Sequence, residues 1–334
     1  MPRVSVVIPT WNGADMLRAA LLSLRGQAFR DFETIVVDNG STDGTVEMLA
    51  GEFPEVRLVA LAENRGFAAA TNAGLQAARG EILVCMNNDC EADPGWIAAL
   101  VDALERRPDA GSVASKMLRA REPGIIDAAG DTVSLVAWNI GRGEPDGPRF
   151  AEGREVLSAC AGAAAYRRTV FETVGWFDED YFAWFEDVDL GLRAQIAGFH
   201  CWYEPTAVVH HLGSATANRA SATKAFYTAR NALLVFFKTM PLPRLMLWAP
   251  LMLLWPWVNP VLNRRPLGPY ARAWVAFLRL LPRTWRKRRA IYARRPREVA
   301  RVRALLDSPL DDIRRALRGA RRTSSALASP AGTP

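Results

Sequence analysis

Short apolar runs alternate with segments of helical spacing along the first third of this chain. The apolar runs, each of strand length, are residues 4–8, 34–37, 56–61 and 82–86. The segments between and after them carry leucines or small residues at helical spacing and are residues 14–26, 45–50, 68–79 and 94–106. This alternation with short connections predicts an α/β fold, a doubly wound and mostly parallel sheet with right-handed crossovers and helices on both faces.

Three of the predicted strands end abruptly in polar loops. These loops are residues 9–13, 38–44 and 87–90. Parallel strands bring their carboxyl ends to one edge of the sheet, and ligands of open α/β sheets bind just beyond that edge. We therefore expect the three loops to converge on one binding site.

The run at residues 82–86 leads directly into Asn87, Asn88 and Asp89. In an extended chain Asn87 and Asp89 project to the same side. Their oxygens suit a hard divalent cation, which would keep some waters and a substrate phosphate as further ligands. The alternative is that the triplet is a turn that caps the helix beginning near Pro94.

A second dense group of functional side chains lies at residues 175–189, where aromatic and acidic residues are mixed. Glu186 and Asp187 begin a predicted helix that ends at Gly198. An acid in the first turn of a helix is kept ionised by the helix dipole, which suits a general base. Aromatic residues here are more often core, but they can also stack on a sugar or a lipid: Trp176, Tyr181, Phe182, Trp184 and Phe185.

The chain changes character beyond residue 215. Residues 245–262 are strongly apolar but contain three prolines, whereas a transmembrane helix needs about 20 apolar residues without interruption. Residues 271–281 place Trp and Phe side chains on one helical face beside an arginine-rich run, as in helices that lie in the membrane interface. We predict peripheral membrane binding, and a single transmembrane segment at 245–262 is the alternative.

The expected organisation is therefore a catalytic domain, a helical region and a tail. The catalytic domain covers residues 1–215, and the helical, membrane-associating region covers residues 216–318. The tail at residues 319–334 is rich in Ser, Ala, Gly and Pro, a composition typical of disorder.

Charge and cysteine content indicate which partners and which cellular compartment to expect. The net charge is +7, but residues 283–303 alone contain ten Arg or Lys against one acid, so the domain before residue 213 is not basic and no nucleic-acid partner is expected. The 4 cysteines have no CxxC spacing, which indicates reduced thiols in the cytosol. The chain enters its first strand at Val4, too early for a signal-peptide core, and we expect a cytosolic catalytic domain.

Five sequence blocks, in this order and spacing, resemble a family 2 glycosyltransferase, in particular the bacterial rhamnosyltransferase-like branch. The blocks are VSVVIPTWNG at 4–13, VVDNGSTDG at 36–44, NRGF at 64–67, MNND at 86–89 and FDEDYF…FEDVDLGLR at 177–193. The resemblance covers about residues 3–215. It implies the type A nucleotide-diphosphosugar transferase fold and an inverting mechanism.

The resemblance also implies which residues bind the nucleotide sugar. Asp38 would accept hydrogen bonds from the base, and Arg65 would lie near the base or the ribose. The alternative is that Asp38 and Ser41 only cap the next helix. The implied set is Pro9, Thr10, Asn12, Asp38, Asn64, Arg65, Asn88 and Arg193. Two interpretations stay open for Arg193, since it either reaches the diphosphate or forms an i,i+4 salt bridge with Asp189 on the helix surface.

The same resemblance implies a metal site for Mg²⁺ or Mn²⁺, which would neutralise the leaving diphosphate. Asn87 and Asp89 occupy the two acidic positions of the family's Asp-x-Asp motif, and Asn87 removes one negative charge from the site. Asp89 would be the ligand, directly or through water. His210 is the other candidate ligand, because it stands three residues before Gly213 as in the family's His-x-x-Gly. His211 is the competing choice.

The implied catalytic residues are Asp187 as general base and Glu186, which would orient the acceptor or Asp187. The predicted function is transfer of a sugar from a nucleoside diphosphate sugar, such as dTDP-rhamnose or a UDP-hexose. The acceptor would be a glycan or a polyprenyl-linked glycan in cell-envelope polysaccharide or O-antigen synthesis, at the cytoplasmic face of the bacterial inner membrane. The alternative is a non-catalytic nucleotide-sugar-binding scaffold. Asn87 alone favours it, and the intact Glu186-Asp187 pair argues against it.

Overall fold

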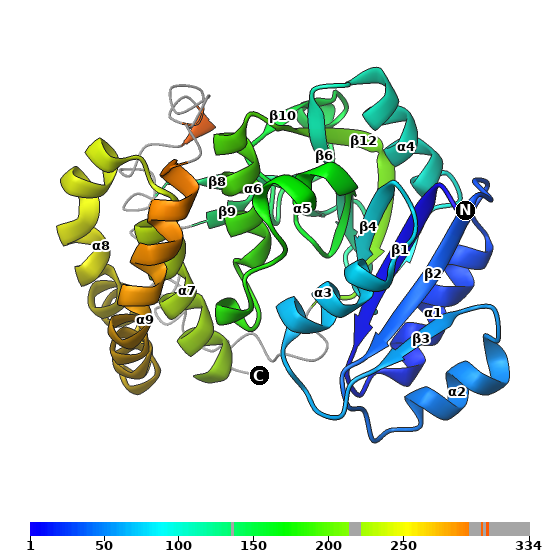
Figure 1. Ribbon diagram of the computed structural model, residues 1–334, viewed down its shortest axis with the longest axis horizontal. Helices are drawn as coiled ribbons and strands as arrows, with labels where there is room; N and C mark the ends of the chain where they lie inside the picture. The colour runs from blue at the N-terminus through cyan, green and yellow to red at the C-terminus, as the bar shows by residue number, and fades with distance from the viewer. Residues whose placement is uncertain (135–136, 214–221, 294–301, 303–304, 307–334) are drawn as a thin grey trace, which may run out of the picture.

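The computed structural model describes residues 1–134, 137–213, 222–293, 302 and 305–306 (Figure 1). Its main sheet has 10 strands, and its central path runs β10-β12-β6-β11-β4-β1-β2-β3. β1 pairs in parallel with β2 and β4, β2 with β3, and β12 with β6, whereas β11 is antiparallel to both of its neighbours. The predicted α/β class and the mostly parallel sheet are confirmed.

The elements alternate as expected in the first half of the chain. The strands are β1 Val4–Thr10, β2 Phe32–Asp38, β3 Arg57–Ala60, β4 Ile82–Met86, β5 Cys90–Ala92, β6 Ala110–Arg119, β7 Ile126–Ala128, β8 Asp131–Val133, β9 Ala137–Asn139, β10 Arg154–Val156, β11 Ala163–Arg167 and β12 His200–His211. The α-helices are α1 Ala14–Arg25, α2 Thr45–Glu52, α3 Phe67–Ala77, α4 Trp96–Arg106, α5 Arg168–Val174, α6 Glu186–Ala197, α7 Ala222–Thr239, α8 Leu242–Leu262 and α9 Gly268–Ala293. Two short 3₁₀ helices are η1 Pro148–Phe150 and η2 Glu179–Tyr181.

β4 lies near the middle of the sheet because every one of its residues is apolar and buried. It pairs in parallel with β1 on one side and antiparallel with β11 on the other. By contrast β3 is the edge strand and is mostly exposed. The central position of β4 puts Asn87–Asp89 at the carboxyl edge, between the ends of β1 and the loop that precedes β11.

Helices cover both faces of the sheet and divide the core into separate layers. Apolar side chains of α1, α2 and α4 pack on one face, and those of α3, α5 and α6 pack on the other. A third apolar cluster joins α6 to α7, α8 and α9. Leu190 and Ala194 of α6 face the sheet, whereas Val188, Leu192 and Ile196 face the C-terminal helices. The helix that begins with Glu186 and Asp187 therefore lies between the two parts of the molecule.

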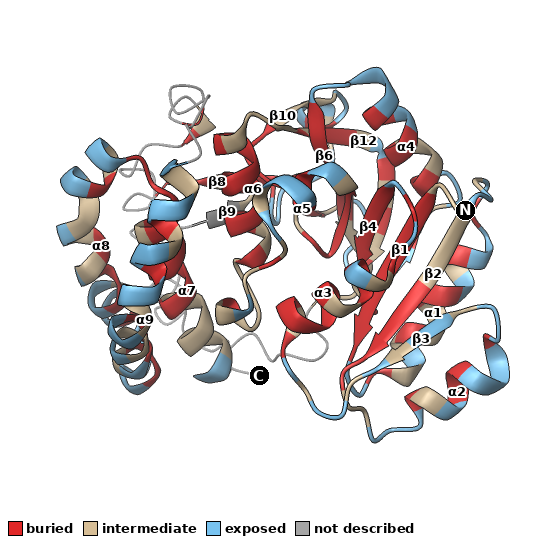
Figure 2. Ribbon diagram, in the orientation of Figure 1, coloured by how far each residue is buried: buried red, intermediate tan, exposed pale blue. Residues whose placement is uncertain are grey.

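The C-terminal helices form a group beside the sheet domain (Figure 1). α8 contains Pro250, Pro256 and Pro260 but continues through all three over 21 residues, so the expected interruption is absent. Among the described residues, α8 is the helix long and apolar enough to cross a membrane, and 28% of its apolar stretch is buried. Much of α8 is exposed or half-buried in Figure 2. Exposed apolar side chains on α8 and α9 include Met246, Leu247, Leu254, Val261, Leu278 and Trp285.

Candidate functional site

The loops that follow β1 and β4 are joined by a side-chain hydrogen bond. Asn88 Nδ2 donates to Thr10 Oγ1 at 2.9 Å, and both residues are buried. Gly13 lies against Asn88, and a Cβ at this position would come within 2.5 Å of Asn88 Nδ2. A side chain at position 13 would displace the Asn88 amide from this contact, and the hydrogen bond joins the two loops at the sheet edge.

The loop after β2 is held by Asp38 and Asn12. The carboxylate of Asp38 accepts the backbone N–H of Ser41 at 3.2 Å, and Asn12 Oδ1 accepts the N–H of Thr42 at 2.8 Å. Asp43 Oδ1 accepts the N–H of Thr45, the first residue of α2, at 3.2 Å, so Asp43 rather than Asp38 or Ser41 caps that helix. Pro9 is buried in β1, one residue before that strand ends at Thr10.

Asn64 and Arg65 belong to a third loop at the same edge. Asn39 Nδ2 donates to Asn64 Oδ1 at 3.0 Å, and Asn39 Oδ1 accepts the N–H of Arg65 at 2.9 Å. The Arg65 side chain is 54% exposed and pairs with Glu179 at 3.6 Å. The structure thus brings the predicted nucleotide-binding residues of the first 90 positions to one edge of the sheet.

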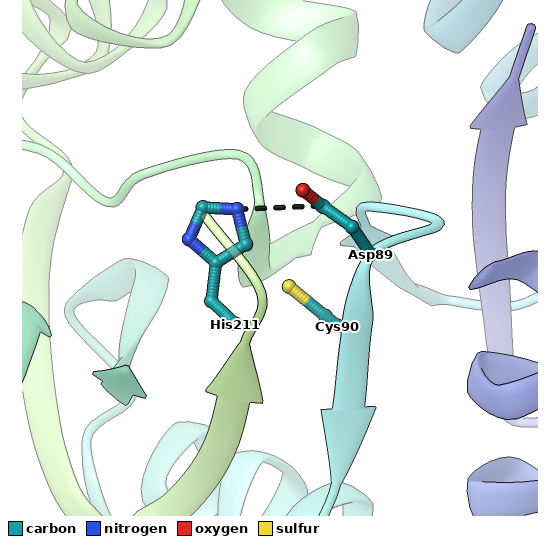
Figure 3. Close-up of side chains that lie close together, drawn as sticks. All are labelled: Asp89, Cys90 and His211. Atoms are coloured by element: carbon teal, nitrogen blue, oxygen red, sulfur yellow. Dashed lines mark ion pairs between the residues drawn. The ribbon is translucent and has the colours of Figure 1, made fainter. Parts of the chain in front are cut away.

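Asp89, Cys90 and His211 lie together where the start of β5 meets the end of β12, with their side chains directed toward one another (Figure 3). One ligand atom from each of the three lies within 4.8 Å of the others. His211 Nε2 is 3.3 Å from Asp89 Oδ1, and His211 Nδ1 is 2.7 Å from Asp127 Oδ2. The result is a carboxylate–imidazole–carboxylate triad, since Asp127 orients the ring that contacts Asp89.

Ionic partners set the charges in this triad. Burial opposes the charged form of Asp127, but the hydrogen bond from His211 and the nearby Arg142 and Arg119 outweigh it and lower its pKa to about 2. Burial likewise disfavours the His211 imidazolium, yet Asp127 and Asp89 raise its pKa to about 9. Burial raises the pKa of the Cys90 thiol well above its usual value, so the neutral thiol is the stable form.

The choice of His210 as the metal-site histidine does not agree with this geometry. Successive side chains of a strand point to opposite sides. His211 pairs in register with Cys90 and turns toward Asp89, whereas the His210 ring lies 3.2 Å from Asp93 and is 42% exposed. The competing choice, His211, is the histidine that the structure brings to Asp89.

Glu186 and Asp187 open α6 as predicted, on a different element from the triad. Asp187 accepts the N–H of Val188 through Oδ1 at 2.8 Å and the N–H of Ala161 through Oδ2 at 3.0 Å. Burial raises the pKa of Asp187 in spite of these bonds. Glu186 is 4% exposed, its Oε2 has no hydrogen-bond partner among the described residues, and burial with the charge of Asp187 raises its pKa well above the usual value.

A short loop at residues 160–162 connects the two acidic groups. Its Ala161 N–H binds Asp187, while the Gly162 carbonyl accepts the N–H of Asn87 at 2.8 Å and the thiol of Cys90 at 3.5 Å. The pKa of the Cys160 thiol is raised well above its usual value by burial and then by Asp187, Asp131 and Asp127. Cys160 therefore lies within electrostatic reach of both groups.

Arg193 lies away from the predicted diphosphate position. Its Nε donates to Asp189 Oδ2 at 2.8 Å, and its other nitrogens donate to the carbonyls of Val174, Gly175 and Trp176. The side chain is 6% exposed. The i,i+4 pair with Asp189 is thus present, but it is buried rather than on the helix surface, and Lys238 of α7 completes it at 2.7 Å from Asp189.

Two features of the site escaped the sequence analysis. Asp127 is 84 positions from His211, in a segment without a regular pattern, and no local signal pairs them. Arg230 and Asn231 of α7 hydrogen-bond the chain just before Glu186. An arginine and an asparagine next to each other in an otherwise apolar helical stretch are a usable signal, because buried polar side chains need partners.

The fold defines the class of protein first. The chain superposes on a mannosyltransferase from Pyrobaculum calidifontis, solved with GDP-Man and Mn²⁺, with a TM-score of 0.54, 22% identity and coverage of 87% of this chain and 84% of the other. That likeness places the chain among type A glycosyltransferase folds. The chain belongs to glycosyl transferase family 2, whose sequence model matches residues 5–175.

Two relatives show how far the similarity extends. An O-antigen biosynthesis protein, RfbC, of Myxococcus xanthus is 32% identical over 228 residues, which is 63% of this chain and 17% of that protein. An N-acetylglucosaminyl-diphospho-decaprenol L-rhamnosyltransferase of Mycobacterium tuberculosis is 32% identical over 237 residues, 63% of this chain and 76% of that protein. The rhamnosyltransferase-like resemblance is confirmed.

Proposed function

We propose that this chain is an inverting, metal-dependent glycosyltransferase. The observation that carries the proposal is the loop at residues 160–162, which binds Asp187 through one residue and the Asn87–Cys90 segment through the next. One-step inversion needs stabilisation of negative charge where the diphosphate departs and a proton acceptor on the opposite face of the sugar. The Asn87–Cys90 segment would hold the cation that stabilises the departing diphosphate, and Asp187 would accept the proton.

The triad fits a resident divalent cation. Asp89 would supply a carboxylate oxygen and His211 would supply Nε2 once the cation displaces the proton on that nitrogen, while Asp127 accepts the Nδ1 proton and orients the ring. An oxygen and an imidazole nitrogen together suit Mn²⁺ better than Mg²⁺, which prefers oxygen alone. When bound, the cation would neutralise the leaving diphosphate as a Lewis acid. The buried Cys90 thiol has a raised pKa, so it stays protonated and is not proposed to bind the cation.

The chain's own residues perform the proton transfer and the positioning. The carboxylate of Asp187 takes the proton of the acceptor hydroxyl while that oxygen forms a bond to the anomeric carbon. The bond from this carbon to the diphosphate oxygen breaks, and the electron pair leaves with the nucleoside diphosphate. The raised pKa of Asp187 makes it a stronger base than an ordinary aspartate. Glu186, with Oε2 unpartnered, orients the acceptor or Asp187.

The donor pocket is built from the loops after β1, β2, β3 and β4. Asp38 and Arg65 are the residues proposed for the base and ribose, and Pro9, Thr10, Asn12, Asn64 and Asn88 hold the loops that surround them. The rhamnosyltransferase relative favours dTDP-rhamnose as donor and a polyprenyl-diphosphate-linked glycan as acceptor, with a UDP-hexose as the alternative donor. The O-antigen biosynthesis relative supports a role in cell-envelope polysaccharide synthesis, such as O-antigen assembly.

The C-terminal helices are proposed to attach the enzyme to the cytoplasmic face of the bacterial inner membrane. Apolar side chains on α8 and α9 are exposed, and α9 carries many arginines that attract anionic lipids. A peripheral attachment keeps a lipid-linked acceptor close to the catalytic domain at residues 1–215. The alternative is that α8 spans the bilayer.

A donor panel tests the function directly. The full chain is mixed with dTDP-rhamnose or UDP-hexoses, with Mn²⁺ and with chelator, and thermal stabilisation is measured before transfer to a polyprenyl-diphosphate-linked acceptor. We expect one donor to raise the unfolding temperature only with metal and to be consumed with acceptor. Failure of every donor to stabilise or react would contradict the proposal.

A further inference from the structure

The chain just before the proposed base is held in an unfavourable backbone conformation. Phe182, Trp184 and Phe185 have φ values of 65°, 67° and 75°, a left-handed region that bulky L-residues rarely adopt. Phe185 is also the N-cap of α6, and its side chain makes no capping hydrogen bond. Such strain persists only where surrounding structure holds it, and it is concentrated at functional sites.

What holds this segment is a pair of side chains on α7, about fifty positions further along the chain. Asn231 Nδ2 donates to the carbonyl oxygens of Tyr181, Ala183 and Trp184 at 2.9, 2.8 and 2.7 Å. Asn231 itself is 0% exposed. The buried Asn231 amide is therefore the shared hydrogen-bond donor for three backbone carbonyls of the strained segment.

Arg230 completes the clamp formed by Arg230 and Asn231. Its Nη2 donates to the carbonyls of Asp180 and Tyr181 at 2.7 and 2.8 Å. Its Nε donates to Asn231 Oδ1 at 2.9 Å, which fixes the amide with its NH₂ group toward the loop. Burial lowers the pKa of this guanidinium.

The clamped segment also contacts the donor loop. The Phe182 carbonyl accepts the N–H of Ala68 at 3.1 Å in the first turn of α3. The Phe182 ring lies so close to Gly66 that a Cβ there would come within 2.5 Å of it. On its other side the ring stacks on Tyr227 of α7, with centroids 4.9 Å apart. The segment thus joins the Asn64–Gly66 loop to the residue that precedes Glu186.

We propose that Asn231, oriented by Arg230, is a positioning residue for the transfer reaction. It fixes the strained segment so that the first turn of α6 directs the Asp187 carboxylate toward the acceptor hydroxyl. This inference rests on the proposed function and extends it, because it makes α7 part of the catalytic apparatus as well as of the C-terminal helical region. Asn231 acts through the backbone and contacts no reacting atom.

The test is Asn231→Asp in the full chain, because the aspartate has the same shape but cannot donate to the three carbonyls. We expect kcat to fall by about 10²-fold, the usual consequence of a misplacement of about 1 Å. Binding of dTDP and UDP with Mn²⁺, measured by calorimetry, should be unchanged. The acid limb of the kcat profile should move, because the environment of Asp187 changes. A purely structural role would lower the fraction folded without moving that limb.

A matched control is Asn263→Asp. Asn263 also donates through Nδ2 to a backbone carbonyl, that of Asn259 at 2.9 Å, but at the end of α8. The Asn263→Asp variant should keep the wild-type kcat and the wild-type pH profile. If Asn231→Asp does not fold, Arg230→Lys replaces it and should give a smaller fall in kcat with the same displaced limb.

The outcomes separate the two proposals. Wild-type kcat and an unmoved acid limb in folded Asn231→Asp would overturn the positioning role, provided that the wild-type chain transfers sugar. Absence of transfer by the wild-type chain with every donor would instead refute the proposed function.

Discussion

Acidic residues lie on both sides of the loop at residues 160–162, and their surroundings shift the carboxyl pKa values in opposite directions. The triad of Asp89, His211 and Asp127 has cations around it, and Asp127 has a pKa lowered to about 2. For Glu186 and Asp187, burial outweighs the hydrogen bonds that oppose it, and both carboxyls have raised pKa values. Asp127 and Asp187, on opposite sides of this loop, thus have pKa values shifted in opposite directions.

The difference shows how one sheet edge can support two kinds of chemistry. Fixed anions attract a cation and position it where a diphosphate leaves. A carboxylate with a raised pKa accepts a proton more readily at neutral pH. Sequence motifs contain acids in both places and do not distinguish them. Burial, His211 and the arginines next to Asp127 make the distinction.

The largest effect is expected from Asp187→Asn, which removes the proton acceptor and keeps the shape. A general base contributes about 10² to 10⁴-fold to the rate, so kcat should fall by that factor. Donor binding with Mn²⁺ should persist, as measured by calorimetry. Asp15→Asn, on an exposed side chain of α1, is the control. Near-wild-type turnover of Asp187→Asn would show that the base lies elsewhere.

The next effect concerns the triad. Asp127→Asn removes the charge behind His211, and loss of such a partner weakens metal binding by about 10 to 100-fold. Titration of the protein with Mn²⁺ measures this change. The matched variant Asp93→Asn removes the partner of His210 instead and should leave the affinity unchanged. Weaker Mn²⁺ binding by Asp93→Asn, with unchanged binding by Asp127→Asn, would indicate that His210 and not His211 is the metal ligand.

A pH profile of kcat sharpens the contrast further. Because the Asp187 pKa is raised, activity should be full above that pKa and fall as pH decreases through it, by about tenfold per unit below it. The fall should begin at a higher pH than the ordinary aspartate value of about 3.9. Rates measured in the presence of saturating metal test this. A rate that stays flat down to pH 4 would contradict the raised pKa.

The smallest effect is expected from Asn87→Asp, which restores the acid that the family's motif has at this position. An added negative charge beside Asp89 should strengthen Mn²⁺ binding severalfold through coulombic attraction. Asn88→Asp is not an equivalent control, because Asn88 Nδ2 donates to Thr10 and would lose that bond. Unchanged or weaker Mn²⁺ binding by Asn87→Asp would show that residue 87 does not face the cation.

Periodicity was sufficient for much of the fold but not for every element. The alternation of residues 4–106 predicted β1 to β4 and their helices, since amphipathic helices and buried strands follow from local pattern alone. The antiparallel strand β11 and the pairing of β12 with β6 were not predicted, because strand order depends on contacts between distant segments. The prolines of α8 do not interrupt its backbone, because a single helix continues through all three.

The sequence was enough to identify the family and to predict the sheet edge and the candidate acids Asp89, Glu186 and Asp187, because each belongs to a contiguous block. Only the tertiary structure decided that His211 rather than His210 meets Asp89, since a one-residue change in a strand reverses the side on which a side chain lies. It also turned Arg193 inward and brought Asn231 to the strained segment. Hydrogen bonds between residues fifty or more positions apart depend on how the helices pack, and no local pattern encodes that packing.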